Sequence, residues 1–179
     1  MKKLLIALLM LITMGAFVGC GGAASSESES AIETELLQTY IFDEEEFSNV
    51  TLNIYEKTRD DKGVLRAQNN TFFITEDGVS QLSEIPMIGM GIMIELDAAA
   101  IERMKAKYFF FLDVAVEDLT YDEVNAAYTL QSGKTFVSEG RTFDGLTIRI
   151  ADERVSQVEG KFGECLIRIS FKDYGKTTV

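Results

Sequence analysis

Alternation of apolar and polar residues near the end of the chain constrains its fold more than any other feature. Two runs show it most clearly, and their apolar members are Leu146, Ile148 and Ile150, then Ile167, Ile169 and Phe171. Successive side chains of a strand point to opposite faces of a sheet, so each run predicts a strand with one buried face. Residues 155–162 return between them after turn residues at 152–154, and a second turn follows at 163–164. We therefore expect three consecutive antiparallel strands.

The same periodicity predicts strands earlier in the chain. Alternation over 50–54 and a polar turn at 59–63 indicate a hairpin whose second strand covers 64–75. Residues 79–85 form either a third strand or an irregular segment. Residues 121–130 predict two short strand ends around an Asp-Glu-Val-Asn-Ala turn.

Two helices are expected, one ahead of the first strand and one between the segments 79–85 and 121–130. Ser30 to Glu33 has the capping-box pattern, and apolar residues then recur at helical spacing as far as Ile41. Asp97 is suited to cap a second helix from Ala98 to about Leu112.

The first residues have the pattern of a secretory signal. Lys2 and Lys3 precede an apolar run from Leu4 to Val18, which is shorter than the roughly 20 residues that a membrane-spanning helix needs. Residues 16–20, Ala-Phe-Val-Gly-Cys, resemble the lipobox of bacterial lipoproteins, although Phe17 stands where that family usually has leucine. The resemblance implies cleavage before Cys20 and a lipid on Cys20 that holds the chain on the outer face of the cell membrane. The alternative is an ordinary signal peptide with an incidental cysteine.

These features divide the chain into three parts. Residues 1–19 are the expected signal peptide, and residues 20–31, rich in glycine, serine and glutamate, form a flexible tether. Residues 32–179 have the length of one α+β domain. With Cys165 as the one cysteine of that domain, a disulfide framework is excluded.

Charge and composition exclude several functions. The chain has a net charge of −12, which argues against nucleic acid as a partner. It contains no histidine, so Ser-His-Asp catalysis, Cys-His catalysis and histidine-bound zinc are excluded. The acidic residues at 43–46 and 60–61 lack calcium-loop spacing, and 132–135 lacks the earlier glycine of a phosphate loop. We expect neither enzyme activity, nor a metal, nor a cofactor.

Three segments in the last third of the chain carry a resemblance to a known group. Residues 119–130, 145–150 and 169–179 resemble small uncharacterised lipoproteins of Gram-positive bacteria, which are distantly similar to the LolA/LppX-LprG-like lipoprotein fold. The resemblance implies a curved, half-barrel-like, mostly antiparallel sheet of about 7–8 strands with two helices on one face. It also implies a carrier that shields an acyl chain.

The stretch 86–94 is the strongest candidate for a ligand site, because it is apolar and rich in methionine and glycine. We interpret it either as a mobile lip over an apolar cavity or as an ordinary core strand or buried connection. In the first case the residues lining the cavity are Met87, Ile88, Met90, Ile92, Phe109 and Phe111.

The sequence thus favours a membrane-anchored extracytoplasmic lipoprotein that binds or carries an apolar, lipid-like ligand or assists assembly of the cell envelope. The alternative is a non-enzymatic protein-interaction or accessory module. Expected partners are the membrane, through the lipid on Cys20, a lipid or other apolar ligand, and an envelope protein. A carrier needs an enclosed apolar cavity, whereas an interaction module needs a filled core and an exposed apolar patch.

Overall fold

The structure is a computed structural model that describes residues 47–85, 90–152 and 154–177. The expected signal peptide, Cys20, the tether and the first helix at 32–41 lie outside the described residues. The described residues all belong to one compact unit of the chain.

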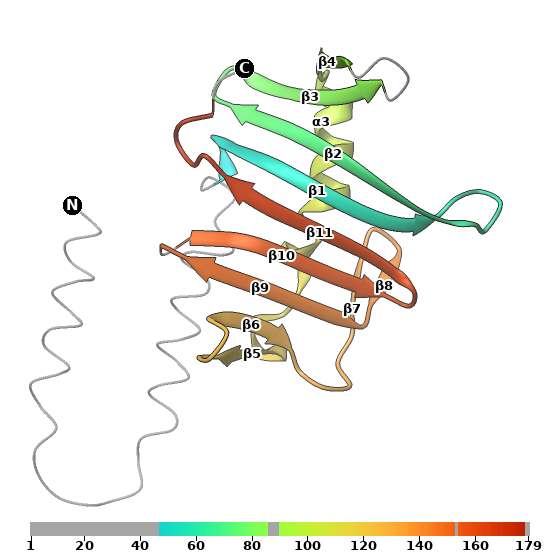
Figure 1. The fold of residues 1–179 in the computed structure, drawn as a ribbon. Helices are drawn as coiled ribbons and strands as arrows, with labels where there is room; N and C mark the ends of the chain where they lie inside the picture. The colour runs from blue at the N-terminus through green and yellow to red at the C-terminus, as the bar shows by residue number, and fades with distance from the viewer. Residues whose placement is uncertain (1–46, 86–89, 153, 178–179) are drawn as a thin grey trace, which may run out of the picture. The chain divides into compact units, whose positions relative to one another are not determined.

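A nine-stranded sheet forms most of this unit, in the order β4-β3-β2-β1-β11-β10-β9-β6-β5 (Figure 1). Its strands are β1 (Val50–Arg59), β2 (Leu65–Thr75), β3 (Gly78–Ile85), β4 (Met90–Glu95), β5 (Leu119–Asp122), β6 (Ala127–Leu130), β9 (Gly145–Ala151), β10 (Arg154–Phe162) and β11 (Cys165–Lys172). Among the described residues every strand pairing is antiparallel. The sheet is open, with β4 at one edge and β5 at the other.

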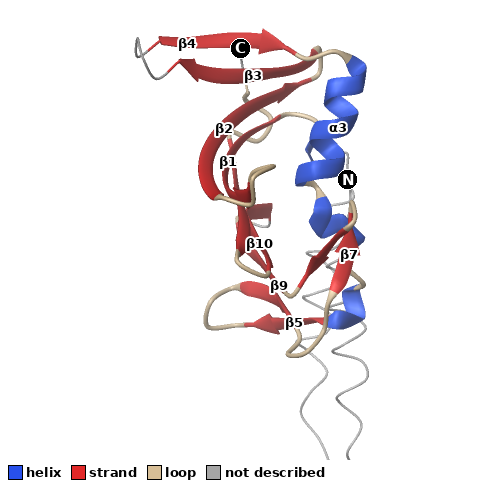
Figure 2. Ribbon diagram, turned by 90° about the vertical axis from the view of Figure 1, so that its right-hand side faces the viewer, coloured by secondary structure: helices blue, strands red, loops and turns tan. Residues whose placement is uncertain are grey.

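One face of the curved sheet carries the remaining elements (Figure 2). These are the helix α3 (Ala98–Tyr108), the 3-10 turns η2 (Phe110–Asp113) and η3 (Val116–Asp118), and a separate hairpin of β7 (Phe136–Ser138) and β8 (Arg141–Phe143). We call the covered side the helix face and the opposite side the outer face. Asp97 caps α3, and its carboxylate accepts a hydrogen bond from the N–H of Ala100 at 2.7 Å.

The expected fold class is confirmed in part. The sheet is mostly antiparallel, but it has nine strands rather than seven or eight. The described residues contain one α-helix rather than two. That helix ends at Tyr108 instead of Leu112, because Phe110 and Phe111 leave it to enter the core through η2. Segment 79–85 is a strand, and 121–130 forms the two expected short strands.

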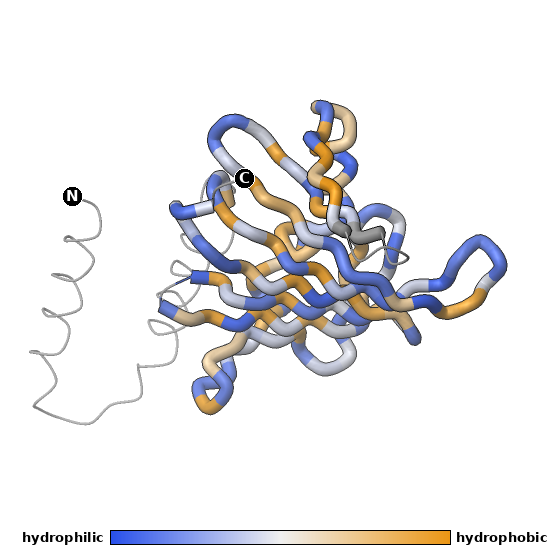
Figure 3. Tube along the Cα trace, turned by 45° about the horizontal axis from the view of Figure 1, so that its top comes forward, coloured by the Kyte–Doolittle hydropathy of each residue, from blue (hydrophilic) through white to orange (hydrophobic). Residues whose placement is uncertain are grey.

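The core lies between the helix face and the elements that cover it. Apolar and polar positions alternate along the strands (Figure 3), as the period of a strand requires. The buried helix-face residues of the central strands are Leu52, Ile54, Leu146, Ile148, Val158, Ile167, Ile169 and Phe171. Met104 and Tyr108 complete the layer from α3.

Candidate functional site

The edge strand β4 is apolar on both of its faces. Ile92, Met93 and Ile94 are 48%, 42% and 45% exposed, in contrast to the buried apolar residues of β1. Three adjacent exposed apolar side chains on a sheet edge are unusual, because natural proteins blunt such edges against unwanted pairing. β4 is therefore a candidate docking surface.

Hydrogen bonding fixes which backbone groups of β4 point outward. The N–H of Leu96, just after β4, donates to the carbonyl of Val79 at 2.9 Å. Residues of a strand alternate in the direction of their N–H and C=O groups, so Ile92 and Ile94 also bond toward β3. Gly91, Met93 and Glu95 thus direct their backbone groups away from β3. No described strand lies on that side of β4.

Register places the β4 side chains on the two faces of the sheet. Gln81 of β3 lies opposite both Phe72 of β2 and Ile94 of β4, so these three share a face. The ring of Phe72 packs 5.7 Å from that of Tyr108 in α3, which identifies the helix face. Ile92 and Ile94 therefore lie on the helix face, and Met93 lies on the outer face.

The centre of the helix face is filled by aromatic side chains. Phe110 stacks on Phe143 with ring centroids 4.5 Å apart and an angle of 7° between the rings. Phe111 meets Phe47 and Phe171 edge-on, at 5.8 and 6.0 Å. Aromatic pairs at these distances contribute beyond the area they bury. These rings pack against one another in the middle of the domain.

The predicted ligand-lining residues are placed in different parts of the structure. Met87 and Ile88 lie outside the described residues, and Met90 begins β4. Ile92 is exposed at the sheet edge, whereas Phe109 and Phe111 are core residues. The 11-residue α3, about 16 Å long at 1.5 Å per residue, lies in the chain between Ile92 and the two phenylalanines. The structure does not bring Ile92 together with the two phenylalanines.

A buried carboxylate lies on the same face, beneath α3. Glu56 of β1 has a side chain that is 3% exposed. Its Oε2 accepts hydrogen bonds from Lys107 Nζ at 2.7 Å, Gln68 Nε2 at 3.0 Å and the Tyr108 hydroxyl at 3.2 Å. A buried charge needs such partners, because an unpaired one is strongly destabilising. The Glu56 cluster therefore attaches the end of α3 to the sheet.

The cluster shifts the pKa of two of its members. Burial by itself raises the pKa of Glu56, but hydrogen bonds from Lys107 and Gln68 and the Lys107 charge hold it below the ordinary glutamate value. Burial, followed by the Glu56 charge, raises the pKa of Tyr108 well above that of an ordinary tyrosine. Glu56 is thus an anion and Tyr108 is neutral at physiological pH. Three protein groups hold Oε2 of this enclosed carboxylate, which is a structural role.

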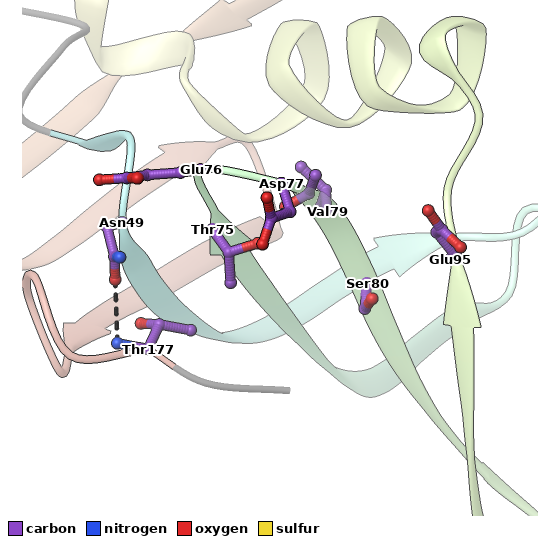
Figure 4. Close-up of a pocket in the computed structure, with 9 residues that line it drawn as sticks. Asn49, Thr75, Glu76, Asp77, Val79, Ser80, Glu95 and Thr177 are labelled. Carbon is purple, nitrogen blue, oxygen red and sulfur yellow. Dashed lines mark hydrogen bonds between the residues drawn. The ribbon is translucent and has the colours of Figure 1, made fainter.

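A polar groove of about 450 Å³ lies where the β2–β3 turn approaches the ends of β1 and β4. Figure 4 shows side chains from these distant segments around it. Its lining residues are Asn49, Thr75, Glu76, Asp77, Gly78, Val79, Ser80, Glu95 and Thr177. The N–H of Thr177 donates to Asn49 Oδ1 at 2.9 Å and holds the chain end beside β1.

The groove is open, and its chemistry is that of hydroxyls and three carboxylates. No set of three or more acidic, cysteine or histidine residues within the described part of the chain is placed to hold a metal ion. The lining does not suit an acyl chain, because burying polar groups against hydrocarbon is unfavourable. We therefore assign the groove no ligand.

The architecture is that of an open antiparallel sheet with one described helix on one face. It is similar to the crystal structure of the lipoprotein LppX from Mycobacterium tuberculosis, at 11% sequence identity and a TM-score of 0.34. The match covers 87% of this chain and 99% of that chain, which agrees with the distant similarity expected from the sequence. At this score the likeness carries no argument about ligand or function.

No family model matches the sequence, and no curated protein matches it. Within the described residues, no helix is long and apolar enough to cross a membrane.

Sequence reasoning missed the Glu56 cluster and the groove. The sequence did contain a signal for Glu56, because it follows Leu52 and Ile54 at a spacing of two and so points to the same buried face of β1. An acid in that phase indicates a buried, partnered carboxylate. The groove had no such signal, because its residues come from four separate parts of the chain.

Proposed function

We propose that this chain is a membrane-anchored, non-enzymatic accessory lipoprotein whose folded domain acts by protein contact along the edge strand β4. One observation carries the proposal: an aromatic-filled helix face is combined with an exposed apolar edge. Phe110 and Phe111 are fully buried, while Ile92, Met93 and Ile94 remain exposed. This is the combination that suits an interaction module rather than a carrier.

Anchoring is supported by the sequence around Cys20. A diacylglyceryl group supplies two acyl chains, and each buried methylene contributes about 0.8 kcal/mol, so two chains anchor where one is marginal. The lipobox-like residues 16–20 and the flexible tether that follows fit attachment to the outer face of the cell membrane. The domain would then meet other proteins of the cell envelope.

Absence of enzyme activity is supported by the residues available for chemistry. The chain contains no histidine, and Oε2 of the buried Glu56 is held by three protein groups. The half-buried Cys165 on β11 lies in a chain without the histidine that activates most catalytic cysteines.

Binding of an apolar, lipid-like ligand is the second candidate. Ile92 and Ile94 are exposed on the helix face and could contact an acyl chain there. The adjoining positions on this face are polar, however: Ile92 lies opposite Ser83, and Ile94 lies opposite Gln81. Gln81 in turn donates to Asn70 Oδ1 at 3.3 Å. An acyl chain along this edge would therefore meet hydrogen-bonding groups as well as isoleucines.

A substitution at the edge tests the contact function. Met93→Lys places a charge on the exposed outer face of β4, as natural edge strands do to prevent pairing. In the full-length chain, cross-linked in intact cell envelopes, we expect Met93→Lys to lose the complexes that the unaltered chain forms. Val124→Lys is the matched control, because Val124 is 94% exposed in the turn after β5, at the other edge of the sheet. Complexes that survive Met93→Lys unchanged would refute contact through β4.

A further inference from the structure

The edge of β4 is complementary to a second copy of itself. We propose that two copies of this chain pair through β4 in an antiparallel arrangement, with Met93 on the twofold axis. The pairing joins the two open sheets into one continuous sheet. It names the partner of the edge described above, and so it rests on the proposed contact function.

Backbone geometry restricts the register of such a pair. New hydrogen bonds between two copies require backbone N–H and C=O groups that point away from β3. The bond from Leu96 to Val79 shows that these groups belong to Gly91, Met93 and Glu95. Centring the axis on Met93 places Met93 opposite its own copy. Gly91 then lies opposite Glu95 of the second copy. Each residue from 91 to 95 then has a partner within the same segment.

Side chains agree with this register. Ile92 lies opposite Ile94 of the second copy, and the pair occurs twice on the helix face. Opposed apolar, β-branched residues are favourable cross-strand pairs. Glu95 faces Gly91, so no two carboxylates lie opposite each other although the chain has a net charge of −12. A register shifted by four residues would place Glu95 opposite Glu95 and is disfavoured by repulsion between like charges.

The edge lacks the devices that prevent pairing. β4 contains no lysine and no proline, and its register with β3 runs without a bulge from Met90 to Glu95. Figures 1 and 2 show β4 as the outermost described strand, so a second copy meets no described element beyond it. A six-residue strand gives a small interface. Anchoring in one membrane would raise the effective concentration of the two copies and favour the pair.

Cysteine cross-linking tests both the partner and the register. In the full-length chain with Cys165→Ser, Met93→Cys would place two thiols across the axis. The Cα atoms of a hydrogen-bonded antiparallel pair are about 5.5 Å apart, within the range that a disulfide bridges. Ile92→Cys is the register control. In the proposed register residue 92 lies opposite Ile94 of the second copy, so the two thiols of this variant are displaced from each other by two residues along the strands. The Cys165→Ser parent reports any cross-link through Cys20.

The amount of disulfide-linked dimer is measured after mild oxidation with copper phenanthroline in isolated envelopes. We expect at least about tenfold more disulfide-linked dimer for Met93→Cys than for Ile92→Cys, since Cα atoms more than 7 Å apart are not bridged. Equal cross-linking of both variants would refute the register. A Met93→Cys thiol that forms no dimer but is protected from maleimide shows a different protein on β4, which refutes self-pairing and leaves the contact function standing. A thiol that is neither linked nor protected refutes both.

Discussion

The ring of Phe110 occupies the space that a β-carbon on Gly160 would need. A Cβ built on Gly160 would lie 2.4 Å from Phe110 Cε2 and 2.9 Å from Phe143 Cε1. Because Gly160 of β10 has no side chain, the stacked rings of Phe110 and Phe143 can pack directly against the sheet. Gly160 is required here for close approach, and the filled core depends on it.

We predict that Gly160→Ala lowers the free energy of unfolding by about 1–3 kcal/mol, the usual cost of overpacking a tight core. Urea unfolding followed by circular dichroism measures this change. Gly145→Ala on the neighbouring β9 is the control, because its added Cβ would have ordinary contact with Lys161 Cβ at 3.4 Å. An equal loss in both variants would show that the Phe110 contact is not the cause.

The Glu56 cluster predicts a dependence of stability on pH. The pKa of Glu56 in the folded chain is lower than its ordinary value of 4.5, so the unfolded chain binds the proton more readily. The contribution of Glu56 is therefore present above pH 4.5 and is lost as pH falls through the lowered folded pKa. We expect the difference in unfolding free energy between the unaltered chain and Glu56→Gln to shrink between pH 7 and pH 3.

A control separates this effect from general acid destabilisation. Glu123 is exposed in the turn between β5 and β6, where its side chain can be changed without disturbing the core. We expect Glu123→Gln to follow the unaltered chain across the same pH series of urea titrations. A difference for Glu56→Gln that stays constant with pH would contradict the assigned pKa direction.

The junction between β4 and α3 depends on the cap of the helix. Removing the Asp97 carboxylate leaves the N–H of Ala100 without its partner. We predict that Asp97→Ala costs about 1 kcal/mol of stability, measured by thermal or urea unfolding. Asp97→Ser keeps a capping oxygen and should retain most of that stability. If both variants are equally unstable, the hydrogen bond to Ala100 is not what matters at this position.

Anchoring gives a prediction that does not depend on the domain. Cys20→Ser removes the thiol that would accept the lipid, and two acyl chains are what hold a lipoprotein on a membrane. We expect the unaltered chain to partition into detergent and the variant to enter the aqueous phase. Partition of both into the same phase would refute a lipid anchor on Cys20.

Regular alternation made the central strands predictable. β9 and β11 lie between other strands of the sheet and have one solvated face, so period two survives in their sequences. In β10 a register shift between Val155 and Gln157 interrupts the period. β4 could not be assigned in this way, because an edge strand that is apolar on both faces has no alternation to detect. Because β4 is apolar on both faces, the sequence pattern did not identify it as an edge strand, and for the same reason it is the candidate docking surface.

The candidate ligand site depended on contacts that no local pattern contains. Residues 86–94 and Phe109 to Phe111 are all apolar, which left open whether they meet. The length of α3 places Ile92 and Phe111 apart, and the packing of Phe111 against Phe47 and Phe171 follows from the order of strands in the sheet. Whether these apolar segments meet is tertiary information, which the local sequence pattern does not contain.

Native mass spectrometry of the lipidated, full-length product tests most directly whether the domain carries an apolar ligand. If the core is filled and the domain acts through β4, the native mass equals that of the acylated polypeptide, or twice that mass for a pair. A further lipid mass that is present in the native ion and lost on denaturation would contradict this assignment. That result would establish the apolar-ligand function instead.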